Sequence, residues 1–247
     1  MGGRNPAGPR ILVVMPAYNE ERTIGAVIDA VAAALPRAAV LVVDDGSTDS
    51  TGARARAKGA DVVRLQINSG IGVAMQTGYI FANRNGYDIV VQIDADGQHD
   101  PVQAERLIVP ILENAADLTI GSRFMGQSSY RSTATRRLGI GWLSLLVRAL
   151  TGRRFSDPTS GFRAAGRSVI GFFAEEYPTD YPEPEVLLVL HRAGFRMLEI
   201  PVVMAERQAG RSSITAIRTL YYLFKVTLAI TIGLFRAPAS KRKTRDG

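Results

Sequence analysis

The sequence contains no cysteine among its 247 residues and only two histidines, His99 and His191. Disulfide bonds and thiolate metal sites are therefore excluded, and a zinc site, which draws most of its ligands from cysteine and histidine, is disfavoured. The lack of cysteine is consistent with a reducing compartment. Residues 1–9 contain no apolar segment of the kind that a secretory signal peptide needs, and we interpret them as a disordered lead-in.

Two glycine-rich nucleotide-binding signatures are also missing. No G-x-G-x-x-G follows the first apolar run, no G-x-x-x-x-G-K-[ST] occurs anywhere, and Gly70 and Gly72 form only a lone G-x-G. NAD-type oxidoreductases and P-loop NTPases are therefore disfavoured. A nucleotide held through a metal ion remains compatible with the sequence.

Basic residues outnumber acidic ones by 30 to 23, which gives a formal net charge of +7. Nucleic acid, an anionic membrane surface or a phosphorylated substrate would each suit such a charge. Because 46% of the residues are hydrophobic, the chain can bury a sizeable core as one large α/β domain or two small ones.

Short runs rich in isoleucine and valine alternate five times with segments of helical spacing. Continuously apolar strands are typical of a parallel sheet that is covered by helices on both faces. We therefore predict an α/β fold, followed by a less regular second half. The expected strands cover 11–15, 40–43, 62–67, 89–93, 118–121 and 195–203, and the expected helices cover 24–35, 50–58, a segment ending near 85, 101–114, 138–150 and 181–193.

Polar residues gather where the predicted strands end. In open parallel sheets, ligands bind outside the carboxyl ends of the strands. Several strand ends that carry polar residues at one edge favour a nucleotide-type site over a set of unrelated helix caps. These residues are Asn19, Glu20, Asp44, Asn68, Asp94, Asp96 and Arg123.

The most informative of these strand ends is the acidic stretch that starts at Asp94. In extended backbone, Asp94 and Asp96 point to the same side of the chain, and Gln98 continues this phase. Two carboxylates and an amide oxygen suit Mg²⁺ or Mn²⁺, which usually shares its ligand shell with substrate phosphates. The alternative is a loop whose aspartates cap the next helix. Asp100 before Pro101 fits such a cap, but it leaves the other two aspartates unexplained.

Four segments, taken in order, resemble glycosyltransferase family two. They are PAYNE at 16–20, VVDDGS at 42–47, DADGQ at 94–98 and GSR at 121–123. Within the family, the similarity is greatest to the dolichol-phosphate mannosyltransferases and related polyprenyl-phosphate sugar transferases, and it covers roughly residues 10–215. The resemblance implies a GT-A domain over residues 10–213, with a Rossmann-like, mostly parallel sheet, and inverting transfer from a nucleotide sugar.

The resemblance also implies roles for individual residues. Asp94, Asp96 and Gln98 would hold the metal ion and the diphosphate, with Asp96 as a catalytic residue. The residues that would bind the nucleotide sugar are Pro16, Ala17, Tyr18, Glu20, Val42, Asp44, Asp94, Ala95 and Asp96.

Six arginines lie between Arg123 and Asp157 with no acidic residue among them. A solvated basic face would explain such a run, but its length favours an anionic partner. Asp157 opens the segment DPTSGFR, which resembles the family pattern D-x-x-S-G-F-[RK]. It would either orient Arg123 or another basic group, or serve as a turn residue before Pro158.

The segment 207–213, RQAGRSS, resembles the family pattern R-x-x-G-x-S-K. Arg207 matches the family's arginine, whereas Ser213 stands where the family has lysine, and Arg211 supplies a cation two residues earlier. The sugar and the nucleotide base therefore remain open. Arg123 and Arg207 are the candidate catalytic arginines, and the residues expected to meet the acceptor phosphate are Arg123, Arg131, Arg207 and Arg211.

The resemblance implies a polyprenyl-phosphate acceptor, and the available charges favour it. A polyprenyl phosphate has a second pKa of about 6 and arrives largely ionised, so it needs cations rather than a base. We therefore predict transfer of a hexose to a polyprenyl phosphate of the dolichyl or undecaprenyl type. The alternative is a sugar hydroxyl on a glycolipid or cell-wall polysaccharide, which needs a general base, with Glu183 or Glu185 as the candidates.

Two other classes explain less of the sequence. A metal-dependent nucleotidyltransferase would use an acidic strand end, but it should carry a loop rich in glycine and lysine after the first strand. A nucleic-acid-binding module would explain the basic charge, but the acidic cluster would repel phosphate. We therefore predict no nucleic-acid partner.

The segment Thr219–Phe235 is mostly apolar, but it contains Lys225. Seventeen residues are the lower limit for crossing a bilayer, and a central charge opposes insertion. We predict that residues 214–247 form an interfacial helix with a polybasic tail, which attaches the enzyme peripherally to the cytoplasmic face of a membrane. The alternative is a helix buried in the core, in a homodimer or against a membrane-protein partner.

Overall fold

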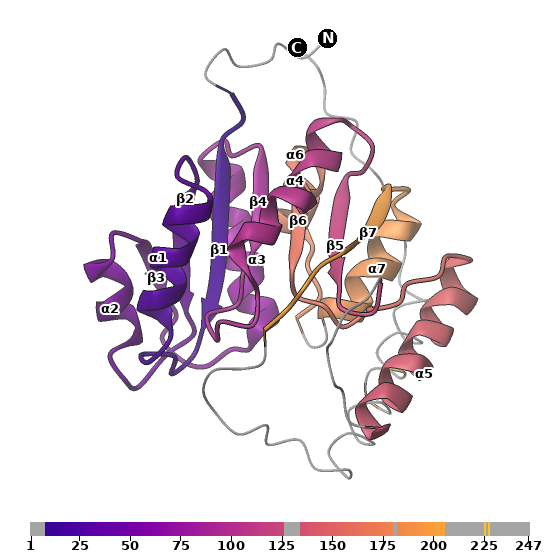
Figure 1. The fold of residues 1–247 in the computed structure, drawn as a ribbon, viewed down its shortest axis with the longest axis horizontal. Helices are drawn as coiled ribbons and strands as arrows, with labels where there is room; N and C mark the ends of the chain where they lie inside the picture. Colours follow the sequence, from indigo (N-terminus) through magenta and orange to yellow (C-terminus); the bar gives the residue numbers. More distant parts are fainter. Residues whose placement is uncertain (1–7, 126–133, 180–181, 206–224, 226, 228–247) are drawn as a thin grey trace.

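A computed structural model of the chain describes residues 8–125, 134–179, 182–205, 225 and 227. Within these residues, seven strands form one sheet in the order β3-β2-β1-β4-β6-β5-β7 (Figure 1). The strands are β1 (Ile11–Ala17), β2 (Ala39–Asp44), β3 (Asp61–Arg64), β4 (Ile89–Gln92), β5 (Leu118–Ser122), β6 (Arg163–Gly166) and β7 (Met197–Pro201).

Strand β6 is antiparallel to both of its neighbours, and the remaining pairs in the sheet are parallel. The predicted mostly parallel sheet is therefore confirmed. Because β6 runs the other way, it begins at the edge where the parallel strands end, and Arg163 lies opposite Gln92 at the end of β4.

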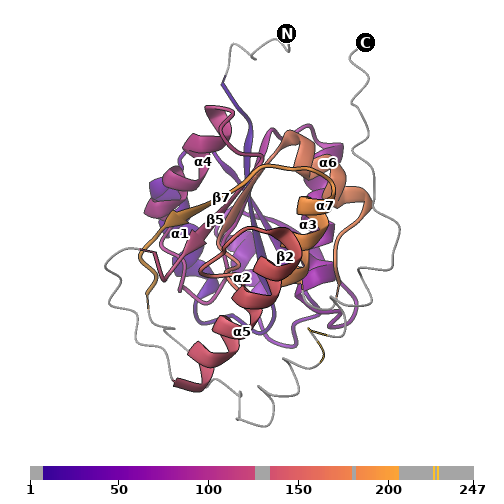
Figure 2. The same cartoon turned by 90° about the vertical axis from the view of Figure 1, so that its right-hand side faces the viewer.

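Helices cover both faces of the sheet (Figures 1 and 2). On one face, a core cluster contains residues of α1 (Ile24–Ala34), α2 (Thr51–Ala57) and α4 (Ala104–Leu112). The core cluster of the other face contains residues of α3 (Ile71–Arg84), α5 (Ala134–Thr151), α6 (Arg167–Glu175) and α7 (Pro182–Arg192).

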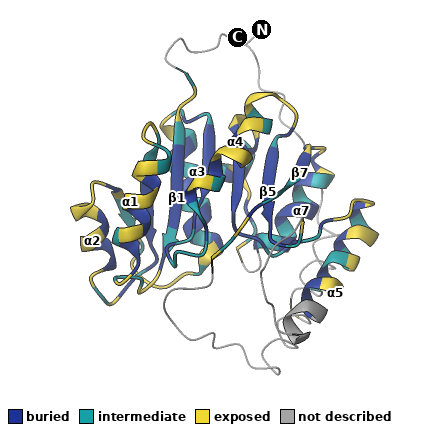
Figure 3. Cartoon of the chain, in the orientation of Figure 1, coloured by how far each residue is buried: buried dark blue, intermediate teal, exposed yellow. Residues whose placement is uncertain are grey.

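Because helices cover both faces of the sheet, the sequences of its central strands are continuously apolar. Leu12, Val13 and Val14 are consecutive in β1, and all three are 0% exposed. Since alternate side chains point to opposite faces, burial of consecutive residues requires packing on both sides. Figure 3 shows the central strands of the sheet mostly as buried and the outer sides of the helices as exposed.

The element boundaries differ from the prediction at several places. The strand expected over 62–67 ends at Arg64, and Ile67 beyond it is 72% exposed. The strand expected over 195–203 is shorter and spans Met197–Pro201. Strand β6 and helix α6 were not predicted: the four residues RAAG contain no run of isoleucine and valine, and only Arg163 was considered, as the end of the segment DPTSGFR.

The predicted cap at Asp100 is confirmed. Its carboxylate accepts a hydrogen bond from the N–H of Val102 at 3.0 Å, and Pro101 opens a 3₁₀ turn, Pro101–Gln103, that leads into α4. The helix expected over 101–114 is therefore present, although its first turn is tighter than an α-helix.

Most of the segment Thr219–Phe235 lies outside the described residues, as do residues 1–7 of the predicted lead-in. Lys225 and Thr227 are described, and both are helical. The indole N–H of Trp142 in α5 donates a hydrogen bond to Oγ1 of Thr227 at 3.2 Å. Among the helices of the described ranges, none is both long and apolar enough to cross a bilayer.

Close packing of α3 on the sheet depends on Gly78. A Cβ at this position would lie 2.5 Å from Cγ1 of Val14, which is itself fully buried in β1. Real Cβ atoms do not approach so closely, so any larger residue would push α3 away from the sheet or force Val14 out of its rotamer.

We expect Gly78→Ala to lower the free energy of unfolding by about 1–3 kcal/mol, because it overpacks this contact. Gly141→Ala is the control, since nothing lies within 4 Å of a Cβ at that position in α5. It should raise stability by about 0.5–1 kcal/mol through helix propensity. Urea unfolding measures both, and equal midpoints for the two variants would contradict the packing argument.

Candidate active site

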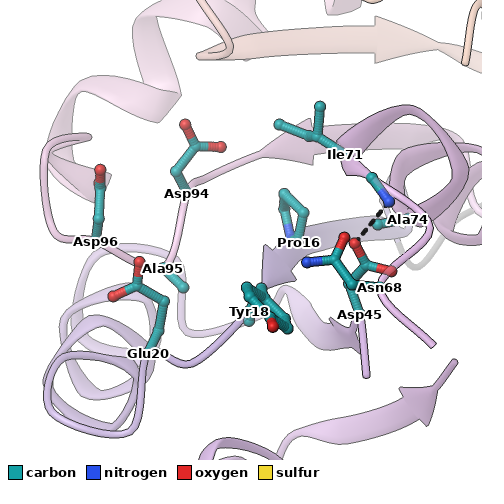
Figure 4. Close-up of a pocket in the computed structure, with 12 residues that line it drawn as sticks. Pro16, Tyr18, Glu20, Asp45, Asn68, Ile71, Ala74, Asp94, Ala95 and Asp96 are labelled. Atoms are coloured by element: carbon teal, nitrogen blue, oxygen red, sulfur yellow. Dashed lines mark hydrogen bonds between the residues drawn. The ribbon is translucent and has the colours of Figure 1, made fainter. Parts of the chain in front are cut away.

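A pocket of about 320 Å³ opens at the carboxyl ends of the central strands. Figure 4 shows Asp94 and Asp96 on one side of it, Asp45 and Asn68 on the other, and Pro16 and Tyr18 between them. The size is within the range of ligand-binding clefts. The lining residues are Pro16, Ala17, Tyr18, Glu20, Asp45, Asn68, Gly70, Ile71, Ala74, Asp94, Ala95 and Asp96.

The loop after β1 is held by the loop after β2. The side-chain oxygen of Asn19 accepts a hydrogen bond from the N–H of Thr48 at 2.8 Å, and the N–H of Asn19 donates to Oγ of Ser47 at 3.0 Å. Asn19 itself has a positive φ of 56°, which asparagine tolerates better than most residues. This turn leaves Tyr18 on the pocket wall, with 44% of the residue exposed.

The structure places Asp45, rather than the predicted Asp44, on the pocket wall. Oδ1 and Oδ2 of Asp45 accept hydrogen bonds from the N–H groups of Ser69 and Gly70 at 2.7 and 2.9 Å, and these bonds fix the loop before α3. Asp44 is 1% exposed and accepts from the N–H of Ser47. Val42 is buried in the core and does not line the pocket.

Residues 94–98, which we call the acidic loop, form a turn beyond β4, with Asp94 and Asp96 on the pocket wall. Oδ1 of Asp94 accepts a hydrogen bond from the side-chain amide of Gln92 at 3.1 Å, and Oδ1 of Asp96 accepts from the N–H of Gln98 at 3.0 Å. Gln98 is half-buried in this turn and is not among the lining residues.

The oxygens of this loop fit a hard divalent cation that is shared with a phosphate. Within the described ranges, no group of three or more histidines, cysteines or carboxylates is arranged to hold a metal ion. Mg²⁺ is nevertheless commonly coordinated by only one or two protein carboxylates, with phosphate and water oxygens as its other ligands. A Cβ at Gly161 would lie 2.8 Å from Nε2 of Gln92 and 3.3 Å from Oδ2 of Asp94, so this glycine keeps the space beside the carboxylate open.

Arg123 and Asp157 form a buried, bidentate ion pair. Nε and Nη2 of Arg123 donate to the two carboxylate oxygens at 2.7 and 2.8 Å, and Nη2 also reaches Oγ1 of Thr159 at 3.2 Å. Arg123 is 6% exposed and Asp157 is 0% exposed. Of the two interpretations of Asp157, the structure supports the one in which it orients Arg123, and the contact of Arg123 with phosphate stays a prediction.

Glu199, which the sequence analysis did not single out, holds the loop that carries Asp157. Its carboxylate accepts hydrogen bonds from the N–H groups of Ser156 and Asp157, each at 2.9 Å to Oε1. Burial raises the pKa of Glu199 more than these bonds lower it. The sequence gives no signal for this contact, because Glu199 and Asp157 are 42 positions apart in the chain.

The two predicted base candidates, Glu183 and Glu185, both lie in the first turn of α7. Burial raises the pKa of Glu183; nearby Arg163 opposes this shift, and the charge of Asp94 adds to it. Nη2 of Arg163 also donates to the backbone oxygen of Glu183 at 2.6 Å. A carboxyl group with a raised pKa close to Asp94 is suited to act as a general base.

The predicted acceptor residues Arg131, Arg207 and Arg211 lie outside the described residues. The histidine in α7, His191, is half-buried at the last turn of the helix. Together, the described site contains a pocket, an acidic loop suited to a cation and a buried arginine.

The model of glycosyl transferase family 2 matches residues 12–174. The chain belongs to this family. The match covers β1 through α6 and therefore includes the pocket, the acidic loop and the Arg123–Asp157 pair.

Relatives with assigned names agree with this membership. A polyprenol monophosphomannose synthase of Mycolicibacterium smegmatis is 33% identical over 88% of this chain and 85% of its own. An undecaprenyl-phosphate mannosyltransferase of Micrococcus luteus is 33% identical over 83% of this chain and 88% of its own. A UDP-N-acetylglucosamine–dolichyl-phosphate N-acetylglucosaminyltransferase of Methanococcus voltae is 26% identical over 90% of this chain and 96% of its own. This chain is a glycosyltransferase.

The fold is also found in solved structures. Glucosyl-3-phosphoglycerate synthase of Mycobacterium tuberculosis, in complex with Mn²⁺, UDP and phosphoglyceric acid, has a TM-score of 0.67 and 28% identity, covering 92% of this chain and 78% of that one. The same enzyme was also crystallised with Mg²⁺ and UDP. The predicted GT-A fold of this family 2 glycosyltransferase is confirmed.

We expect Asp157→Asn to destabilise the glycosyltransferase by about 3–5 kcal/mol, because it leaves the buried charge of Arg123 without its counter-ion. Asp29→Asn is the control, since the ion pair of Asp29 with Lys58 is exposed on the surface. Its removal should leave the urea midpoint nearly unchanged. If the two variants unfolded at the same urea concentration, the Arg123–Asp157 pair would not contribute this much to the stability of the fold.

Proposed function

We propose that this glycosyltransferase moves a hexose from a nucleotide-diphosphate sugar to a polyprenyl phosphate of the dolichyl or undecaprenyl type, with inversion at the anomeric carbon and with Mg²⁺ or Mn²⁺. The observation that carries the proposal is the similarity to two polyprenyl-phosphate mannosyltransferases across more than four fifths of each chain. The named substrates of those relatives supply the acceptor class.

The pocket supports the donor side of the proposal. Tyr18 offers an aromatic face for a base, and Asp45 and Asn68 offer polar groups for a base and a ribose on the wall opposite Asp94 and Asp96. A cation held by Asp94, Asp96 and Gln98 would neutralise the charge of the diphosphate leaving group. The protein's own part is to orient the donor so that the anomeric carbon faces the acceptor.

The chain path supports the acceptor side. The N–H of Ala205 donates to the backbone oxygen of Gln98 at 3.0 Å, and Met204 pairs with His99 in an isolated β-bridge. The described chain at Met204 and Ala205 therefore lies beside the acidic loop, and the predicted acceptor arginines Arg207 and Arg211 follow in the sequence. Arginine binds phosphate oxygens in pairs of hydrogen bonds.

A second acceptor class is favoured by a different observation. Glu183 has a raised pKa and lies near enough to Asp94 to feel its charge, as a general base for a sugar hydroxyl would. Since one fold hosts many functions, the fold by itself does not choose between these acceptors.

Helix α5 supports the proposed peripheral attachment to a membrane. Trp142 and Leu145 are 50% and 60% exposed on this helix, and Arg148 and Arg153 are exposed near its end. Apolar side chains flanked by cations suit a surface of anionic lipid. The basic residues after Thr219–Phe235, from Lys241 to Arg245, would add to that attraction.

We expect Asp96→Ala to abolish sugar transfer while the protein keeps its fold, because the donor diphosphate loses its cation. The measurement is nucleoside diphosphate release from a panel of nucleotide sugars, with and without EDTA, and with circular dichroism as the check on folding. Asp61→Ala removes an exposed carboxylate of β3 and should retain activity. Normal turnover after EDTA treatment would show that transfer does not require a divalent cation.

We expect Arg207→Ala to lower kcat/KM far more than Glu183→Gln. Loss of a charge-assisted contact to a buried phosphate costs about 2–5 kcal/mol, and about 1.4 kcal/mol corresponds to tenfold in rate. Arg84→Ala, which removes an exposed arginine at the far end of α3, is the control.

The opposite order would assign the acceptor to the hydroxyl class, because loss of a general base costs about 10²- to 10⁴-fold. An inactive Glu183→Gln enzyme beside a nearly normal Arg207→Ala enzyme would therefore overturn the phosphate acceptor. It would leave the family and the donor site untouched.

We expect a chain truncated after Ser213 to lose flotation with anionic liposomes, and Leu145→Glu to weaken it in the full chain. Neutral liposomes are the control, since they remove the electrostatic part of binding. Unchanged flotation of the truncated chain would instead favour a helix at Thr219–Phe235 that packs against protein.

A further inference from the structure

His99 is a buried histidine to which the mechanism above gives no role. It lies five residues beyond Asp94, it is 6% exposed, and it is not among the residues that line the pocket. Its Nδ1 accepts a hydrogen bond from the backbone N–H of Asp94 at 3.0 Å. Its Nε2 lies 3.7 Å from Oδ2 of the same aspartate. One ring nitrogen of His99 therefore faces the backbone of Asp94, and the other faces its side chain.

The ring of His99 is held firmly in this position. It stacks on Phe162 with ring centroids 4.9 Å apart and an angle of 12° between the planes, and Phe162 is 0% exposed. Phe162 is fixed in turn, because its backbone oxygen accepts the N–H of Gly121 at 2.8 Å. The backbone of His99 pairs with Met204. Contacts on the ring face, at the ring edge and along the backbone leave His99 little freedom.

This arrangement fixes the backbone at Asp94, while the side-chain amide of Gln92 donates a hydrogen bond to Oδ1 of its carboxylate. The acidic loop has left strand β4 by Asp94, so its N–H has no partner in the sheet ladder and takes its hydrogen bond from the imidazole. Without an acceptor at Nδ1, a buried N–H would be left unsatisfied, and the loop would rotate to find another partner. Gly161 leaves room beside the carboxylate, so packing on that side does not hold Asp94 in place.

His99 is not placed to bind the cation itself. Its Nδ1 is used by the Asp94 N–H, and its Nε2 faces a carboxylate oxygen rather than the pocket. Groups that orient metal ligands without touching the metal commonly change metal affinity by about 10- to 100-fold when they are replaced.

We infer that His99 is a positioning residue for the divalent cation: through the hydrogen bond that its Nδ1 accepts, it holds the backbone of Asp94 in the orientation that lets this residue bind the ion and the donor diphosphate. This inference rests on the proposed function, in that Asp94 and Asp96 are the cation's ligands. What it adds is a specific requirement for a hydrogen-bond acceptor at the Nδ1 position.

Two substitutions separate the acceptor from the aromatic ring. His99→Asn places Oδ1 close to the position of Nδ1 and keeps the acceptor, but it loses the stack on Phe162. His99→Phe keeps the stack and loses the acceptor. The probe is Mn²⁺, whose free concentration is followed by electron paramagnetic resonance in the presence of GDP and, in a parallel series, UDP. Melting temperatures of all three proteins are measured alongside.

The inference predicts that His99→Phe binds Mn²⁺ about 10- to 100-fold more weakly than the wild type, while His99→Asn stays close to it. In turnover assays, the Phe variant should show a raised KM for Mn²⁺ and a kcat near normal once Mn²⁺ saturates.

Wild-type Mn²⁺ affinity in His99→Phe would overturn the inference, and so would an equal loss in folded His99→Asn. If His99→Phe fails to fold, the Asn variant decides alone, because weak Mn²⁺ binding despite its acceptor contradicts the role of Nδ1. A wild-type protein that binds no Mn²⁺ with either nucleotide would overturn the proposed function itself, and the inference with it.

Discussion

Strand β6 is the element that joins the two halves of this sheet, because it pairs with both β4 and β5 and runs against both. The parallel strands β3, β2, β1 and β4 form the half that carries the pocket, and β5 and β7 form the other half. An antiparallel strand between them brings the loop before β6 to the carboxyl edge. Asp157 and Gly161 thereby reach Arg123 and Asp94 from a distant part of the sequence.

Burial of charge makes this edge rigid. Arg123 faces Asp157, Glu199 accepts the backbone N–H groups beneath Asp157, and Arg163 donates to the backbone oxygens of Ser160 and Glu183. Removing the charge of Asp157 from its buried pair with Arg123 would cost about 3–5 kcal/mol. Polar groups that are fixed before the substrate binds do not need to reorganise during the reaction, and such preorganisation is a major source of catalytic rate.

Enzymes named for different acceptors share this fold. The chain resembles transferases named for polyprenyl, undecaprenyl and dolichyl phosphates, and also a synthase crystallised with phosphoglyceric acid. In the proposed function, the base, ribose and diphosphate of the donor would bind at the strand ends and the acidic loop. One fold can host many such functions, because the residues that choose the acceptor can change while the sheet stays the same.

The sequence by itself determined the alternation of strands and helices, the cap at Asp100 and the acidic loop at one edge of a mostly parallel sheet, because each depends on neighbours in the chain. Only the tertiary structure decided that Asp45 rather than Asp44 faces the pocket, because adjacent residues point to opposite sides and the strand's register selects between them. The same holds for β6, for the contact of Glu199 with Asp157 and for the stack of His99 on Phe162. The contacts of Glu199 and His99 join residues more than 40 positions apart, and β6 is stabilised by pairing with its neighbouring strands. No local sequence pattern therefore encodes these features.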